Sequence, residues 1–379
     1  MKKILALILA ALLIFCMVAC GQPDEQDTDE ENLDEVKSEI SVKSGKFVYA
    51  ANGSGDYEII DYIPSGVKVT ELLELPKTTD DGRDIIGIAS DAFKADLTIK
   101  AVNIPDTYTY IGDFAFYDCD NLESVTMTSS VVSAGKYSFA ECDKLASLKL
   151  SSSIATISEG MFKNCVSLTS VSVPKLAAEI CDSAFLGCKA LSIITLPSGL
   201  SKITKNAFYG CDELKYTVDG NAKYLGNTDN PHLALISALD LNIEECAVNK
   251  NTVLVADNAF ANCEYLEKLV LGEAVTYISN AAVMGCESLE YNEFDNARYL
   301  GDAKNPYAVM ISVINLSHET LKLHADTRII TAEAFKSCIK LEAISYDKTT
   351  SDWNSIIKTE NWNHEINITV ICNGDAQAD

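Results

Sequence analysis

The sequence has 379 residues, 47% of them hydrophobic, and a formal net charge of −25. This length and composition are ample for a large folded core. The acidic charge argues against nucleic acid as a partner, because binding it needs a basic surface that releases counterions. Adhesion of the protein surface to an anionic membrane is disfavoured for the same reason.

The chain begins with the features of an export signal. Lys2 and Lys3 precede an apolar run over residues 4–19, which is shorter than the ~20 residues of a membrane-spanning helix. The run ends in Met17-Val18-Ala19-Cys20-Gly21, which resembles a bacterial lipobox, although Met17 replaces the usual Leu. The resemblance implies that residues 1–19 are a lipoprotein signal peptide and that Cys20 carries the lipid. An ordinary signal peptide followed by an incidental Cys is the alternative.

Residues 20–45 are expected to form an acidic, disordered tether. Nine acidic residues crowd a segment with almost nothing to bury: Asp24, Glu25, Asp27, Asp29, Glu30, Glu31, Asp34, Glu35 and Glu39. Loss of residues 1–19, whose only charges are those of Lys2 and Lys3, would change the net charge from −25 to −27.

The strongest feature is a repeat of 23 residues. An anchor residue opens each unit: Phe93, Phe116, Phe139, Phe162, Phe185, Phe208, Phe260, Val283 and Phe335. Three residues after each anchor except the first stands a Cys: Cys119, Cys142, Cys165, Cys188, Cys211, Cys263, Cys286 and Cys338. A Leu or Ile follows six residues after each anchor, from Ile99 to Leu341.

Each unit combines a turn or short helix around the anchor with an alternating strand such as residues 122–127. One unit cannot bury its own apolar stripe, whereas stacked units make the stripe continuous. The expected fold is therefore an α/β repeat: a leucine-rich-repeat solenoid with a parallel β-sheet on one face and short helices or turns on the other. The repeat region is placed at residues 85–346.

Two anchor intervals, from Phe208 to Phe260 and from Val283 to Phe335, are longer than the rest. They share the motif Tyr224-Leu225-Gly226 … Asn230-Pro231, which recurs from Tyr299 to Pro306. Each interval is interpreted as one ordinary turn and one longer turn. With Leu73 and Leu75 in a first strand, the sequence predicts about 12 stacked strands spanning ~55 Å.

The ends of the array are expected to be covered by caps. Residues 46–84 form the N-terminal cap and first strand, and the segment from Phe47 to Tyr62 is predicted to be a β-hairpin over that strand. Residues 347–379, which contain Trp353 and Trp362, form the C-terminal cap and tail.

The unit I-x-x-x-A-F-x-x-C-x-x-L-x-x-V-x-L-P, seen from Ile180 to Pro197, resembles the BspA-type leucine-rich repeat of bacterial surface proteins. The resemblance covers roughly residues 45–373. It implies an exported or surface-attached protein that binds host matrix, other cells or neighbouring bacteria, and it transfers no catalytic residue.

The Cys column is interpreted as small apolar side chains that close each turn, held as buried free thiols. Neighbouring rungs are close enough that spacing alone leaves disulfides open. The chain has no C-x-x-C pair, and its four His, which are His232, His318, His324 and His364, lack zinc-ligand spacing. We therefore expect no metal and no cofactor.

No catalytic motif is recognised, so the protein is expected not to be an enzyme. Paired acids such as Asp80-Asp81 are expected to be solvated surface in so acidic a chain. The turns at residues 80–84 and 227–230 contain oxygen ligands suited to weak Ca²⁺ binding, but ordinary turn chemistry explains them equally well.

The outward strand positions carry mainly small hydroxyl residues in the N-terminal units. The C-terminal units instead carry Tyr216, Lys268, Tyr291 and Glu293, which form the candidate ligand-binding face because interface energy concentrates at aromatic anchors. The predicted function is adhesion, or binding of a protein or glycan, at the extracellular face of a bacterial envelope. A structural spacer or coat protein without a specific ligand is the alternative.

Overall fold

The structure, a computed structural model, describes residues 41–43, 47–64, 70–359, 362–363 and 366–377. The expected signal peptide, Cys20 and most of the expected tether lie outside the described residues. One part of the tether segment is inside them: Ser41–Lys43 forms β1, which pairs antiparallel with β2 (Phe47–Ala51). A strand therefore lies within the segment expected to be disordered.

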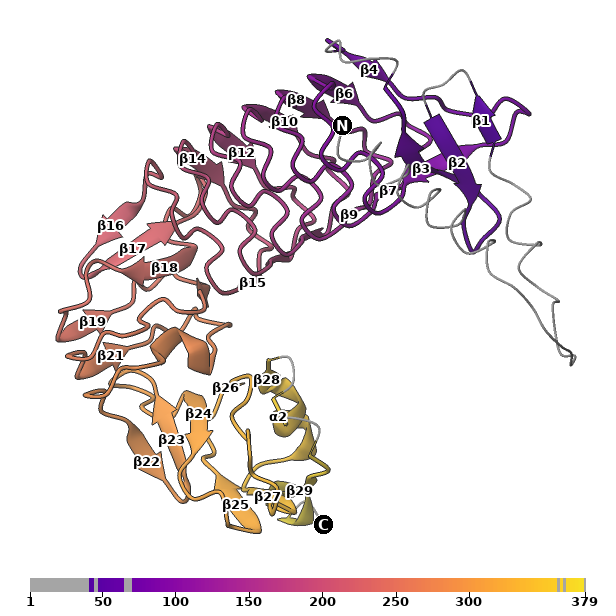
Figure 1. Cartoon of the computed structure of the whole chain (residues 1–379). Coiled ribbons are helices and arrows are strands. Elements are labelled where there is room, and N and C mark those ends of the chain that lie inside the picture. Colours follow the sequence, from indigo (N-terminus) through magenta and orange to yellow (C-terminus); the bar gives the residue numbers. More distant parts are fainter. Residues whose placement is uncertain (1–40, 44–46, 65–69, 360–361, 364–365, 378–379) are drawn as a thin grey trace, which may run out of the picture. The chain divides into compact units, whose positions relative to one another are not determined.

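Short parallel strands stack along one side of the repeat region and confirm the predicted solenoid (Figure 1). Val125 pairs with Leu148, its equivalent in the next unit, and the residues on either side of Val125 are less buried. This strand ladder consists of β4 (Leu73–Glu74), β6 (Ala101–Asn103), β8 (Ser124–Thr126), β10 (Ser147–Lys149), β12 (Ser170–Ser172), β14 (Ile193–Thr195), β19 (Glu245–Ala247), β21 (Lys268–Val270), β25 (Thr320–Leu323), β27 (Ala343–Tyr346) and β29 (Thr369–Cys372).

A second ladder of very short parallel strands runs along the opposite side of each turn and was not predicted. Its inward residues, such as Ile111, Ile157 and Ile180, are fully or almost fully buried. The strands are β5 (Ile85–Ile88), β7 (Tyr110–Ile111), β9 (Ser133–Ala134), β11 (Thr156–Ile157), β13 (Glu179–Ile180), β15 (Lys202–Ile203), β20 (Leu254–Val255), β26 (Ile329–Ile330) and β28 (Ile357–Lys358).

The segment around each anchor is a turn and not a short helix, which decides between the two forms that the sequence left open. Residues two before and two after the anchor adopt left-handed backbone, for example Ser183 (φ +57°) and Gly187 (φ +74°) around Phe185. A right-handed helix cannot continue through such residues. Among the described units, only that of Val283 has a helical turn there, the 3₁₀ helix η1 (Asn280–Val283). We call the five residues centred on each anchor the anchor segment.

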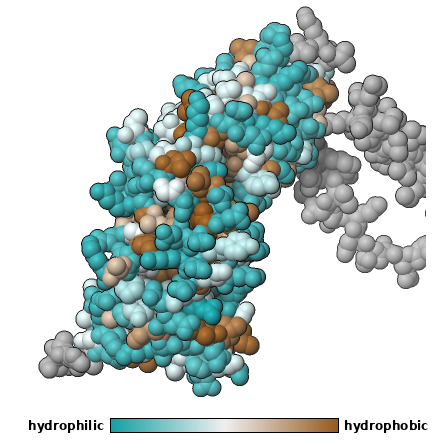
Figure 2. All heavy atoms as spheres, turned by 90° about the vertical axis from the view of Figure 1, so that its left-hand side faces the viewer, coloured by the Kyte–Doolittle hydropathy of each residue, from teal (hydrophilic) through white to brown (hydrophobic). Residues whose placement is uncertain are grey.

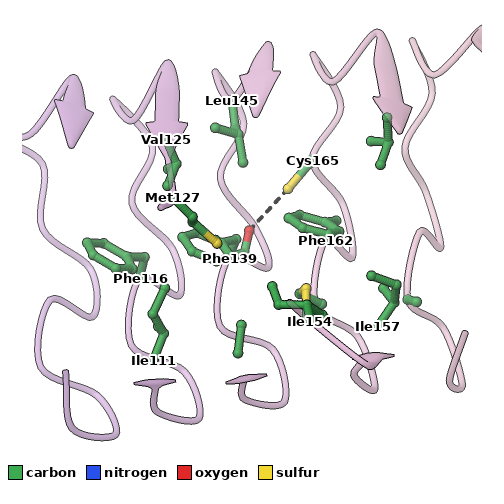
Figure 3. Packing of buried hydrophobic residues seen from close by; sticks show 14 of the residues in the cluster. Ile111, Phe116, Val125, Met127, Phe139, Leu145, Ile154, Ile157, Phe162 and Cys165 are labelled. Carbon is green, nitrogen blue, oxygen red and sulfur yellow. Dashed lines mark hydrogen bonds between the residues drawn. The ribbon is translucent and has the colours of Figure 1, made fainter. Parts of the chain in front are cut away.

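The core is built from columns of identical side chains stacked turn upon turn (Figure 3). Six phenylalanine rings from Phe93 to Phe208 stack with centroids 4.8–5.9 Å apart. Burial of each ring contributes about 1.5–3 kcal/mol, and both faces of an interior ring are covered only because a turn lies on either side. The stack thus makes the stability of each turn depend on its neighbours.

The expected hairpin is formed by β2 and β3 (Tyr57–Tyr62), which pair antiparallel. Its place differs from the prediction, because β3 pairs with β5 and so extends the second ladder, not the first strand β4. The ring centroid of Tyr62 lies 5.6 Å from that of Phe93, and the ring centroid of Phe47 lies 5.3 Å from that of Tyr62. The hairpin therefore continues the ring stack at its N-terminal end.

Each of the two long turns folds as a three-stranded antiparallel unit, which interrupts the parallel strand ladder that was predicted to run through them. The first contains β16 (Thr217–Asp219), β17 (Ala222–Leu225) and β18 (Ala234–Ala238). The second contains β22 (Asn292–Phe294), β23 (Ala297–Leu300) and β24 (Val309–Val313). Both β18 and β24 rejoin the second ladder in parallel, with β20 and β26.

The C-terminal end combines the α-helix α2 (Thr350–Ser355) with one more rung, β29, which the predicted set of strands did not include. Thr349 caps α2 through a reciprocal pair of hydrogen bonds with Asp352. Trp362 lies edge-on to Phe335 at 5.7 Å and to Trp353 at 5.9 Å. Trp362 therefore covers the last anchor ring, and Trp353 packs against Trp362.

Candidate binding surface

The four candidate residues occupy different settings. Three of them lie eight residues after their anchors: Tyr216, Lys268 and Tyr291. The fourth, Glu293, lies on β22, which begins directly after Tyr291. Lys268 and Glu293 are exposed, whereas both tyrosines are partly buried and pack against the core. Packing against the core therefore fixes the two tyrosine rings, although each ring keeps part of its surface exposed.

Each tyrosine lines a hollow beside a long turn. The first hollow has a volume of about 390 Å³ and is lined by Tyr216, Lys223, Asp257 and the anchor segment of Phe208. The second has a volume of about 450 Å³ and is lined by Tyr291, Glu293, Arg298 and residues 283–287 except Met284. The structure thus places Tyr291 and Glu293 together, Tyr216 in a separate hollow, and Lys268 in neither.

The two hollows are copies of one design, because Tyr216 and Tyr291 hold equivalent positions before the two long-turn hairpins. A cation from the neighbouring strand stands over each ring: the Lys223 ammonium is 5.9 Å from the Tyr216 centroid, and the Arg298 guanidinium is 5.6 Å from that of Tyr291. Contacts of this kind contribute about 0.5–1 kcal/mol at exposed sites. Arg298 Nε also lies 3.6 Å from a carboxylate oxygen of Glu293. The residue equivalent to Glu293 in the first long interval is Val218, which does not line the first hollow.

Burial raises the pKa of both Tyr216 and Tyr291, and desolvation is the first cause in each case. Their hydroxyls stay protonated at neutral pH and offer a neutral donor beside an apolar ring. Such amphipathic rings are common at protein interfaces.

Inside each long turn a buried tyrosine fixes the hairpin. The Tyr224 hydroxyl accepts a hydrogen bond from the Asn249 backbone N–H at 3.1 Å, and burial raises its pKa to about 12. Tyr299 repeats the arrangement with the His324 backbone N–H at 3.3 Å. These contacts tie each hairpin to the next strand-ladder rung.

Sequence reasoning missed Lys223, Arg298 and Tyr209. Tyr209 is 73% exposed and lies on the rim of the first hollow. In both long intervals an aromatic residue is followed seven positions later by a cation, and this recurrence is the signal that could have revealed the two cations. Apart from its aromatic side chain, nothing in the sequence indicates that Tyr209 lies at the first hollow.

Figure 2 shows that the side of the molecule bearing the long-turn hairpins is largely hydrophilic with separate hydrophobic patches. Exposed apolar residues near the candidate site include Ile193, Val218 and Leu241, each 55–56% exposed. Apolar residues that are exposed singly are ordinary on protein surfaces, so these residues add no argument for a binding site.

The two turns considered for Ca²⁺ are held by their own hydrogen bonds. Asp81 accepts from Thr79 Oγ1 at 2.5 Å and from Arg83 Nε at 2.7 Å. Asn227 Oδ1 accepts from the backbone N–H groups of Asp229 and Asn230 at 3.0 and 2.9 Å. In the part of the chain that the structure describes, no three His, Cys, Asp or Glu side chains form a group that could hold a metal ion.

The Cys column has a specific structural role. Six of its thiols donate to the carbonyl of an anchor residue in the preceding turn at 3.0–3.1 Å: Cys119, Cys142, Cys165, Cys188, Cys211 and Cys286. All eleven cysteines within the described residues are free thiols. Burial raises the pKa of Cys211 to about 12 and that of Cys286 to about 11, which keeps both S–H donors protonated.

Stacked turns of regular length, with inward Phe, Cys and Leu columns and a parallel strand ladder, define a leucine-rich-repeat solenoid. A profile of the BspA type leucine-rich-repeat region matches residues 86–215 and 239–357 in six copies, about two thirds of the chain. The protein therefore belongs to the BspA-type leucine-rich-repeat family. The interval between the two matches, 216–238, contains the first long-turn hairpin.

Several solved structures are similar to this chain. The leucine-rich-repeat protein of Treponema pallidum matches at 22% identity and a TM-score of 0.45, over 59% of this chain and 90% of that one. A leucine-rich cell surface protein of Faecalibacterium prausnitzii matches at 21% identity and a TM-score of 0.39, over 86% and 99%. At these identities the likeness concerns the fold alone. No curated protein matches the chain.

Proposed function

We propose that the protein is a non-catalytic binding scaffold of the bacterial cell surface. In this proposal a lipid on Cys20 anchors the chain to the extracellular face of the envelope. The ligand is macromolecular: a host matrix or cell-surface protein or glycan, or the surface of another bacterium. Within the described residues no helix is long and apolar enough to cross a membrane.

One observation carries the proposal: the duplicated pairing of a half-buried tyrosine with a cation beside an open hollow, at Tyr216 with Lys223 and at Tyr291 with Arg298. Tyr and Arg are the residue types in which binding energy concentrates. A ring already fixed by its neighbours loses little conformational entropy when a ligand docks. Over residues 101–195 the outward strand-ladder positions carry mainly small hydroxyl residues and no such pair, so that half acts as a spacer.

The proposal is tested with the full chain displayed on cells and measured against matrix proteins, mucins and whole bacteria. Tyr216→Ser combined with Tyr291→Ser is expected to lower adhesion at least tenfold, whereas Tyr216→Phe combined with Tyr291→Phe keeps the rings and most of the binding. Tyr265→Ser is the matched control, since Tyr265 is 59% exposed and lines neither hollow.

Thermal unfolding of each variant separates lost binding from lost folding. Adhesion that is unchanged in a folded double Ser variant would contradict the proposed site. Failure of the wild-type chain to bind any surface would support the spacer alternative. Turnover in esterase, protease or glycosidase screens would contradict the non-catalytic assignment.

A further inference from the structure

A directional ladder of backbone hydrogen bonds links the anchor segments. In each regular turn, N–H groups at alternate residues donate to carbonyls of the following turn: Ser183 to Lys205 at 2.9 Å, Phe185 to Ala207 at 2.9 Å, and Gly187 to Tyr209 at 2.8 Å. The alternation of left-handed and right-handed residues aims these donors in one direction, as in the anion-binding nests formed by such backbone.

The ladder stops at the anchor segment of Phe208. The backbone N–H groups of Asn206, Phe208 and Gly210 have no hydrogen-bond acceptor within the described part of the chain. The reason is that the following long turn contains the hairpin β17–β18 in place of an anchor segment. The three donor residues line the first hollow.

The ring stack stops at the same place. Phe208 has Phe185 on one side at 5.6 Å, but the next anchor ring, Phe260, belongs to the turn after the hairpin. Phe208 is 6% exposed, whereas the interior rings Phe116 to Phe185 are 0% exposed. One face of the stack therefore borders the hollow.

The far wall of the hollow also bears an unpaired group. Asn258 Oδ1 is buried without a hydrogen-bond partner, and Asn258 lines the hollow together with Asp257 and Ile236. The two walls are joined where the Asp257 N–H donates to the Ile203 carbonyl at 3.1 Å. The hollow therefore resembles a gap from which one anchor segment is missing.

We propose that the first hollow binds a peptide segment of a partner protein that supplies this missing rung. Backbone carbonyls of the peptide accept from the Asn206, Phe208 and Gly210 N–H groups, and an aromatic side chain covers the open face of Phe208 beside Tyr216. The inference rests on the proposed binding function and names its partner class. Binding through main-chain hydrogen bonds with a pocket for one side chain is a common mode of peptide recognition.

Two features favour a peptide over a simple anion. The three N–H donors lie at alternate residues, and the equivalent N–H groups in every preceding regular turn donate to three separate carbonyls. The row of donors therefore matches the carbonyls of an extended peptide better than it matches a single anion. Asp212 and Asp257 also line the hollow, and their carboxylates repel an anion. The second hollow lacks the ring face, because its anchor is Val283 and η1 replaces the left-handed residue before it.

The test uses the full chain and a fluorescent, end-blocked peptide with the sequence of residues 256–262, which contains the anchor segment after the gap. A second peptide has its Phe replaced by Ala. Fluorescence anisotropy is expected to show saturable binding of the first peptide and at least tenfold weaker binding of the second. Equal binding of the two peptides, or no saturable binding, would overturn the proposal.

Ser237→Phe fills the hollow from β18 and is expected to lower peptide affinity at least tenfold. Ser312→Phe, at the equivalent position on β24, is the matched control and should bind normally. Hydrogen exchange on the wild-type chain gives an answer even if Ser237→Phe fails to fold. The peptide should slow exchange at residues 206–210 and leave residues 281–285 unchanged, and the absence of that protection would refute the assignment.

Competition with inorganic phosphate distinguishes the anion alternative, because displacement of the peptide by phosphate would mean that the N–H row binds an anion. The inference and the proposed function fail differently. If the chain does not bind the peptide but shows Tyr216-dependent adhesion, only the peptide-binding inference is rejected. If the wild-type chain shows no adhesion, the proposed scaffold function is rejected.

Discussion

The Cys165 thiol donates a hydrogen bond to the carbonyl oxygen of Phe139, in the preceding turn, at 3.1 Å (Figure 3). The thiol and the ring of Phe139 are both fully buried. One small side chain thereby fills the turn and satisfies a carbonyl of its neighbour. Because the same pair recurs in five other turns, the contact is a structural element of the repeat.

Removal of this thiol should destabilise the solenoid. Cys165→Ala loses the S–H donor and leaves a small cavity, so we expect a loss of about 1–2 kcal/mol in the free energy of unfolding. Cys372→Ala, at a half-buried position on β29, should change it by less than about 0.5 kcal/mol. Urea denaturation measures both, and equal effects would show that the buried hydrogen bond contributes nothing.

The buried thiols should resist alkylation in the folded protein. Only thiolates react, and burial raises the pKa of Cys211 to about 12 and that of Cys181 to about 11. At pH 8 we expect the half-buried Cys181 to be labelled before the buried column, which should react only on unfolding. Residue-resolved mass spectrometry after iodoacetamide treatment provides the measurement, with denatured protein as the control. Rapid labelling of Cys165 or Cys188 in folded protein would contradict the packing.

Left-handed glycines should differ in tolerance according to their neighbours. A Cβ at Gly187 would collide with Asn164 Oδ1, whereas one at Gly210 would lie 3.4 Å from Gly187 Cα. Both residues have φ of +74°, so each substitution strains the backbone. We expect Gly210→Ala to cost about 1 kcal/mol and Gly187→Ala about 2–3 kcal/mol. Thermal and urea unfolding compare them, and the reverse order would contradict the close approach.

Asp257 should give the stability a distinctive pH dependence. Burial is the main cause that raises its pKa above the ordinary value of 3.8, while hydrogen bonds from Ser279 and Tyr277 lower it in part. Since the folded state holds this proton more tightly, the stabilisation is complete below the unfolded pKa and is lost as pH rises through the folded pKa.

Asp257→Asn removes this titration. Relative to the wild type, its free energy of unfolding should therefore increase between pH 4 and pH 7. Urea titrations at successive pH values test the sign, with Asp212→Asn as a control for a general reduction of negative charge. A constant difference between Asp257→Asn and wild type across this range would show that the carboxylate is not held in a desolvated site.

The periodic part of the fold was predictable because each column has one inward environment that only a few residue types satisfy. Phe116, Cys119 and Leu122 recur in unit after unit for that reason. The second ladder escaped prediction because strands as short as Tyr110–Ile111 leave only one inward residue per turn. The left-handed backbone of the anchor segments was not predictable either. Phe114, Tyr137 and Ser183 adopt positive φ at positions where a glycine or asparagine would have indicated a turn.

The candidate site was predictable only in outline. Tyr216 and Tyr291 could be placed on outward positions by counting from their anchors. The cations that stand over the two rings, Lys223 and Arg298, approach from hairpins whose path the period does not determine. The gap beside Phe208 is visible in sequence only as an absent anchor, and an absence does not reveal which backbone groups lose their partners.

The uniform direction of the anchor-segment hydrogen bonds gives the array a polarity. Peptide dipoles aligned from turn to turn add up as they do along a helix, with the donor end at Phe208 and the acceptor end towards the N-terminal hairpin. Any turn inserted between Phe116 and Phe185 must offer carbonyls backward and N–H groups forward. Gain or loss of whole repeat units preserves that match, so tandem duplication can lengthen the molecule without redesigning either terminus.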